Sequence, residues 1–107
     1  MKTCLIALFL LLAVGCKPAD VARKSFQETK IEAEKGNAPA QYNLGVMYGN
    51  GRGVPKDEAE AYKWWLLAGA QGDQDAKMNI SEIERKITPA QRTEGQRLAR
   101  EWKSRKP

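Results

Sequence analysis

In the middle of the chain, apolar residues recur at the spacing of an α-helix. One helical face is marked by apolar positions i, i+4, i+7 and i+8: Ala40, Leu44, Met47 and Tyr48. A second segment has the same kind of face: Ala61, Trp64, Trp65 and Ala68. Between them, residues 49–55 contain three glycines, which suit a tight reversal, and Pro55, which suits a first helical turn. The pattern predicts two antiparallel helices, over 38–48 and 55–71.

Capping signals predict three further helices, over 20–35, 74–86 and 89–103. Asn37 and Asp73 are suited to N-cap positions, and Gly36 and Gly72 to helix ends. The last helix begins with Thr88-Pro89-Ala90-Gln91, a capping box with proline at the first helical position. Together these segments predict an all-α fold.

The two outer helices are expected to close opposite ends of the core. The apolar face of the helix over 89–103 has three members: Leu98, Ala99 and Trp102. The helix over 20–35 has a thinner face: Val21, Phe26 and Ile31. A stack of helix pairs exposes apolar surface at each end, so each end needs a capping helix with one apolar face and a polar outer face.

The chain also contains an internal repeat. A shift of 36 residues places Gly36 on Gly72, Ala40 on Ala76 and Leu44 on Ile80. It also places Asn43 on Asn79, Phe26 on Tyr62 and Ile31 on Leu67. A period in this range is typical of stacked helical hairpins.

The repeated segment resembles the Sel-one-like repeat, a relative of the tetratricopeptide repeat. The resemblance rests on motif positions across one period: Leu44, Gly45, Tyr48, Gly51, Gly53, Ala61, Trp64, Ala68 and Gly72. It implies a short α-solenoid of antiparallel helix pairs, about five helices in all. We assign a complete repeat to 37–72, a partial second repeat to 73–86 and a capping helix to 89–103, within a domain over 21–107. The chain departs from the pattern at Gly69, where alanine is usual, and at Ser81, which replaces the small residue that Gly45 provides.

The N-terminus predicts export. Lys2 precedes an apolar run over 4–14, which at 11 residues is shorter than the roughly 20 needed to span a bilayer. The segment Ala13-Val14-Gly15-Cys16 resembles the lipobox of bacterial lipoproteins. We therefore expect a signal peptide over 1–15, lipid attachment at Cys16, and a tether over 16–20. The alternative is an ordinary secretory signal that contains a cysteine.

This interpretation predicts a lipid-anchored protein of the bacterial cell envelope. Because Lys17, and not aspartate, follows the cysteine, the outer membrane is expected in a Gram-negative source. Cleavage would leave 92 residues and no thiol for a disulfide, so helix packing must stabilise the domain. The mature chain has a net charge of +4, and the excess lies in residues 85–106, which contain eight basic and two acidic residues. Outside the cytoplasm, this predicts acidic protein or anionic envelope surfaces as partners, and no nucleic acid.

Catalytic signals are few. The chain has no histidine, its cysteines are assigned to the signal and to lipidation, and Gly-x-Ser-x-Gly and Ser-x-x-Lys motifs are absent. The neighbouring carboxylates lack the spacing of a metal-binding loop. Some cysteine-rich members of the repeat family bind or hydrolyse β-lactams, but their disulfide cysteines are missing here. We therefore predict no enzyme activity, cofactor or metal.

The resemblance implies an interaction or scaffold module that binds a protein or peptide on a small helical surface. The candidate partner-binding residues are aromatic or basic: Tyr42, Tyr48, Trp65, Arg97, Arg100 and Lys103. Trp64 and Trp65 lie about 100° apart on a helix, so one is expected to be buried and the other partly exposed. Two alternatives are a binder of anionic envelope polymer or lipid through the basic C-terminal helix, and a carboxylate-dependent cell-wall enzyme. The small surface predicts modest binding, or assembly into an oligomer or larger complex.

Overall fold

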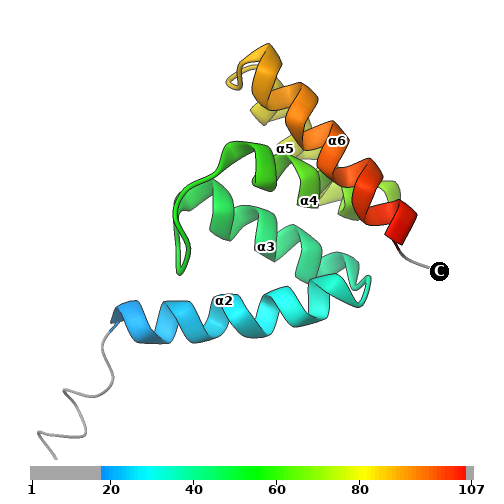
Figure 1. The fold of residues 1–107 in the computed structure, drawn as a ribbon. Helices are drawn as coiled ribbons and strands as arrows, with labels where there is room; N and C mark the ends of the chain where they lie inside the picture. Colours follow the sequence, from blue (N-terminus) through cyan, green and yellow to red (C-terminus); the bar gives the residue numbers. More distant parts are fainter. Residues whose placement is uncertain (1–17, 106–107) are drawn as a thin grey trace, which may run out of the picture.

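A computed structural model describes residues 18–105 (Figure 1). This part of the chain forms five helices: α2 (Pro18–Glu34), α3 (Ala38–Asn50), α4 (Glu58–Ala70), α5 (Gln74–Glu84) and α6 (Pro89–Arg105). The predicted all-α class and the number of helices are confirmed. The expected signal peptide over 1–15 and the lipid site at Cys16 lie outside the described residues.

Helix α4 occupies the centre of the fold. It packs against α3, α5 and α6, while α2 packs against α3. Figure 1 shows α2, α3 and α4 stacked in order, with α6 crossing α4. The sequence of α4 accounts for its position, because eight of its thirteen residues are buried, and a helix that is apolar on most sides is stable only when neighbours cover it.

The side-chain caps predicted for three helices are present. Asn37 and Asp73 accept hydrogen bonds from the backbone nitrogens of Ala40 and Ala76 (3.0 and 2.8 Å), as predicted. The capping box is also confirmed, since Thr88 and Gln91 each accept a bond from the backbone nitrogen of the other (3.1 and 2.9 Å).

The start of α4 corrects the sequence prediction. Pro55 lies in the preceding loop, and α4 begins at Glu58, where the Asp57 side chain accepts a bond from the Glu60 nitrogen (3.1 Å). An Asp N-cap provides a partner for an otherwise unpaired helical N–H, which proline at 55 does not.

The reversal between α3 and α4 uses two glycines, not three. Gly51 and Gly53 have φ values of 68° and 77°, whereas Gly49 lies inside α3. At Gly53 the space is also limiting, because a Cβ would overlap the carbonyl group of Ala22 in α2. The loop thus packs against the first helix.

Of the three residues predicted for the apolar face of α2, only Phe26 is buried. Phe26 and Ala33 are buried, whereas Val21 and Ile31 are 57% and 56% exposed. Ile31 follows Phe26 by five residues, which places it about 140° around the helix. Since α2 packs mainly on α3, only the face that carries Phe26 and Ala33 is covered.

The two adjacent tryptophans of α4 belong to different clusters, and both are buried. Trp64 packs with Leu44, Leu67 and Trp102, while Trp65 packs with Tyr62 and Ile83. The expectation that one of them is partly exposed is wrong, because only 1% of Trp64 and 8% of Trp65 is exposed. They do point in different directions, but neighbouring helices cover both sides of α4.

Candidate functional site

A groove of about 390 Å³ lies between α3 and α5, with part of α4 along it. We call it the α3–α5 groove. Its lining comes from three helices and the turn after α5: Tyr42, Val46, Gly49, Asn50, Glu58, Trp65, Asn79, Glu82, Ile83 and Lys86. Apolar side chains and uncharged amides therefore lie next to one another in a single depression.

The contact between Gly45 and Trp65 shapes this groove. The Trp65 indole nitrogen donates a hydrogen bond to the Tyr42 carbonyl oxygen (3.1 Å). A Cβ at position 45 would lie 2.6 Å from Cδ1 of Trp65, inside van der Waals contact. Because Gly45 has no side chain, the Trp65 indole can lie directly against α3. The hydrogen bond to Tyr42 then fixes the position of the indole, which forms one wall of the groove.

The polar edge of the groove combines amides with exposed ion pairs. Glu58 pairs with Lys56 (3.4 Å), and Glu82 pairs with Arg85 (2.5 Å). The Glu82–Arg85 pair is exposed and Glu58 is partly exposed, and pairs of this kind contribute little stability, so a charged group of a ligand can replace one partner. Asn50 and Asn79 supply donors and acceptors of the kind that bind a peptide backbone.

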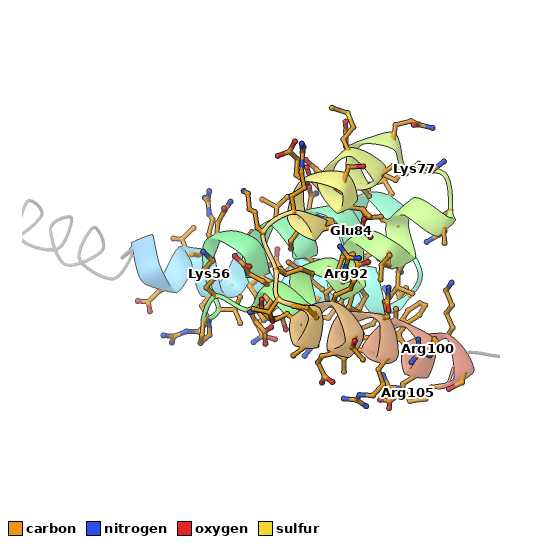
Figure 2. The ribbon with its side chains drawn as sticks, turned by 90° about the horizontal axis from the view of Figure 1, so that it is seen from above. Lys56, Lys77, Glu84, Arg92, Arg100 and Arg105 are labelled. Atoms are coloured by element: carbon orange, nitrogen blue, oxygen red, sulfur yellow. The ribbon has the colours of Figure 1, made fainter. Side chains whose placement is uncertain are left out.

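A hydrogen-bonded junction fixes the end of α5 next to the groove. The Tyr62 hydroxyl donates to Glu84 Oε2 (2.6 Å), and Gln96 donates to the Tyr62 oxygen (3.5 Å). Arg92 donates to the Glu84 carbonyl oxygen (2.9 Å), and Figure 2 shows these two residues close together. Burial, followed by the bond to Glu84, raises the pKa of Tyr62. The junction joins α4, α5 and α6.

The structure places two of the six candidate partner-binding residues in the α3–α5 groove, Tyr42 and Trp65. Tyr48 packs edge-on against Phe26, with ring centroids 5.5 Å apart. Arg97 forms ion pairs with Glu94 and Glu101, and the bond from Arg97 lowers the pKa of Glu94. Arg100 and Lys103 line a separate depression beside α6.

Apart from Tyr42 and Trp65, the residues that line the α3–α5 groove were not predicted from the sequence. Val46 lies four residues after Tyr42, and Ile83 lies four after Asn79. This i, i+4 spacing is a signal that pairs of residues share a helical face, but it does not reveal that the two faces oppose each other. Their meeting depends on how α3 and α5 pack on α4.

Other site types find no support within 18–105. This part of the chain has no group of three or more acidic, histidine or cysteine side chains placed to hold a metal ion. Nor does any helix there combine the length and apolar character needed to cross a membrane.

The helix pair that forms one side of the groove matches a known family. Residues 38–73, which contain α3 and α4, match the family model of the Sel1 repeat. This segment is therefore similar to a Sel1 repeat. Gly45 and Trp65, whose contact holds the groove wall, both lie inside the matched region.

Three relatives are 36–42% identical to parts of this chain. The Azotobacter vinelandii alginate biosynthesis protein AlgK is 36% identical over 76 residues, 71% of this chain and 16% of the relative. The Arabidopsis thaliana ERAD-associated E3 ubiquitin-protein ligase component HRD3A is 36% identical over 61 residues, 56% of this chain and 9% of the relative. Chitin synthase regulatory factor 3 of Schizosaccharomyces pombe is 42% identical over 48 residues, 45% of this chain and 5% of the relative. The chain thus spans less than a fifth of each relative.

Proposed function

We propose that this chain is a non-catalytic interaction module of the bacterial cell envelope that binds a protein or peptide in the α3–α5 groove. Sel1 repeats are protein-interaction scaffolds. The observation that carries the proposal is the juxtaposition of Tyr42 and Val46, which are partly exposed, with the amides of Asn50 and Asn79 in one groove. Apolar side chains provide contact area for a ligand side chain, and amides provide hydrogen bonds that fix its orientation.

The names of the relatives support an accessory role. One is a component of a ubiquitin ligase, one is a regulatory factor of chitin synthase, and one is a protein of alginate biosynthesis. A module that binds a partner, and leaves the chemistry to that partner, fits all three descriptions. We therefore favour a role for this chain as a subunit or regulator of a larger envelope assembly.

The size of the groove sets the expected mode of binding. A depression of about 390 Å³ holds a few side chains of a peptide and not the face of a folded domain. A short extended or helical segment of the partner is the occupant that fits, and its affinity is expected to be modest unless several modules bind together.

Photo-crosslinking tests the binding site. A photoreactive amino acid at Asn79 of the full chain, expressed in its native envelope, is expected to capture a defined partner, because position 79 lines the groove. The matched control carries the same group at Lys24, on the exposed surface of α2. Asn50→Arg, at the other side of the groove, should abolish capture from position 79. Equal products from both positions, or capture that persists in Asn50→Arg, would contradict the groove as the binding site.

The envelope location is proposed on the basis of the N-terminal sequence, with Cys16 as the lipid attachment site. Intact-mass spectrometry of membrane-extracted protein should show an acylated chain that begins at Cys16. Cys16→Ser should leave an unprocessed or soluble exported chain. A mature form that begins at another residue, or that lacks acyl mass, would rule out the lipoprotein.

A further inference from the structure

A second groove of about 450 Å³ lies on the other flank of α5, between α5 and α6. We call it the α5–α6 groove. Its floor is apolar and built largely from small residues: Leu66, Gly69, Ala70, Ile80 and Ala99. Its rim is polar: Lys77, Gln96, Arg100 and Lys103. None of these residues lines the α3–α5 groove, so the two depressions are separate surfaces.

The path of α6 leaves this groove open. Among the described helices, α5 and α6 each pack along α4. The C-terminal half of α6 is held toward α2, because the Trp102 indole donates to Glu34 Oε1 (2.6 Å). The outer sides of α5 and α6 therefore stand apart over Gly69, which has no side chain, and the small side chain of Ala70 in α4.

The charge of the rim is cationic and uncompensated. Within 18–105, no carboxylate lies within ion-pair distance of Lys77, Arg100 or Lys103, and no acidic side chain lines the groove. Arg97, one turn earlier on α6, is instead paired with Glu94 and Glu101. Figure 2 shows Lys77 and Arg100 on different helices toward the same end of the domain. The available positive charge thus lies on both sides of an apolar floor.

We propose that the α5–α6 groove binds an acidic segment of a protein partner. An apolar side chain of that segment enters the floor between Leu66 and Ile80, and flanking carboxylates face Lys77 on one rim and Arg100 and Lys103 on the other. Two opposed rims match a peptide with acidic residues on both sides of one apolar anchor, since opposite charges then meet on each side. Gln96, which also donates to Tyr62, adds a neutral polar contact.

The position of the groove favours a peptide over a lipid surface. Trp102 and Glu34 join the C-terminal half of α6 to the C-terminal end of α2. Helix α2 has 17 residues, so about 25 Å separates this contact from Pro18, where the described chain begins. The cationic rim therefore lies far along the domain from the end nearest the expected lipid site at Cys16.

Fluorescence anisotropy with the full chain in detergent tests the proposal. The probe is a labelled ten-residue peptide with a central leucine–phenylalanine pair and glutamates on either side. The wild-type chain should bind it, and binding should weaken with added salt because the rim is exposed. Arg100→Glu combined with Lys103→Glu should weaken binding about tenfold. Lys24→Glu combined with Lys30→Glu on α2 makes the same change in net charge and should leave binding within about twofold of wild type.

Further variants distinguish binding in the α5–α6 groove from a general effect of net charge. Ala70→Trp adds bulk at an exposed floor position without changing charge and should also prevent binding. Lys86→Glu alters only the α3–α5 groove and should have no effect, so this test is independent of the function proposed above. If the double variant on α6 melts abnormally by circular dichroism, Lys77→Glu on α5 replaces it.

Three results would overturn the proposal. The first is no binding of the acidic peptide at low salt. The second is equal loss in the α2 control. The third is binding of phosphatidylglycerol vesicles that depends on Arg100 and Lys103 while the peptide fails to bind, since this would assign the groove to anionic lipid.

Discussion

The Trp102 indole nitrogen donates a hydrogen bond to Glu34 Oε1 at 2.6 Å, and these two residues lie 68 positions apart in the chain. The contact joins the last described helix to the first one. Trp102 also packs edge-on against Trp64, with ring centroids 5.9 Å apart, so its ring is fixed by the core as well. The outer helices therefore meet at one end of the domain.

Loss of this contact should destabilise the whole domain. We expect Trp102→Phe to lower the free energy of unfolding by about 1–3 kcal/mol, since it removes buried aromatic surface and leaves Glu34 without the indole donor. Glu34→Gln keeps an acceptor of the same shape and should cost less than about 1.5 kcal/mol. Urea unfolding of the single and double variants measures the coupling between the two residues. Strictly additive effects would contradict a direct interaction.

Two glycines of α3 give a matched test of the groove wall. Gly45→Ala should destabilise by about 1–3 kcal/mol, because its Cβ would overlap the Trp65 indole. Gly49→Ala meets the same indole only at 3.5 Å, an ordinary contact, and should be neutral or stabilise by up to about 1 kcal/mol through helix propensity. Thermal melts followed by circular dichroism compare the two. Similar melting temperatures for both variants would show that the wall tolerates a side chain at position 45.

The helices were predictable from sequence because their signals are local. Asn37 and Asp73 lie next to the first residues of their helices and cap them as predicted. The start of α4 was misplaced since Pro55 and Asp57 are both plausible start signals, and only the hydrogen bond to Glu60 distinguishes them. Local patterns thus locate helices well and their ends less well.

The arrangement of the helices was less predictable, because it depends on contacts between distant residues. The exposure of Ile31 follows from the face of α2 that α3 covers, and the burial of Trp65 follows from coverage of α4 on both sides. The candidate site was difficult to predict for the same reason, because it also depends on contacts between distant residues. Tyr42 and Trp65 were recognisable from the sequence as aromatic candidates. The ion pairs of Arg97 with Glu94 and Glu101 were not predicted and are seen only in the structure.

Alkaline pH should weaken the fold through Tyr48. Burial, followed by the nearby charges of Glu60, Asp57 and Glu34, raises its pKa from 10.0 to about 12. Because the pKa is higher in the folded state, this stabilisation is fully present below pH 10 and is lost as the pH rises through 12. A shift of this size corresponds to at most about 2–3 kcal/mol, which partial solvent exposure reduces to about 1–2 kcal/mol.

Tyr48→Phe isolates this effect, since phenylalanine keeps the ring against Phe26 and cannot ionise. Melting temperatures at pH 8 and pH 11 should show a smaller alkaline loss for the variant than for wild type. Apart from position 48 the two proteins have the same ionisable groups, so the effects of those groups cancel in the comparison. An equal loss in the two proteins would show that Tyr48 does not couple folding to pH.

The last prediction concerns Lys63, a lysine with only 7% of its surface exposed. Its Nζ lies 3.7 Å from Glu60 Oε1 and 4.3 Å from the centre of the Trp64 ring. Burial lowers the pKa of Lys63 and outweighs the opposing attraction to Glu60 and Glu34. A pKa lowered by folding means that the charged amine is less stable in the folded state than in the unfolded state at neutral pH. The charge therefore costs stability despite its two favourable contacts.

Lys63→Met should accordingly stabilise the domain at pH 7, by about 1 kcal/mol, because it keeps an unbranched side chain and removes the buried charge. Glu60→Gln should have the opposite effect, since it removes the nearest carboxylate and leaves the ammonium group less compensated. In the Lys63→Met background, Glu60→Gln should lose most of its cost, because the charge it compensated is gone. Urea unfolding at pH 7 compares the four proteins. If Lys63→Met is less stable than wild type, the ion pair and the contact with the Trp64 ring outweigh the cost of burial, and Lys63 stabilises the core as a cation.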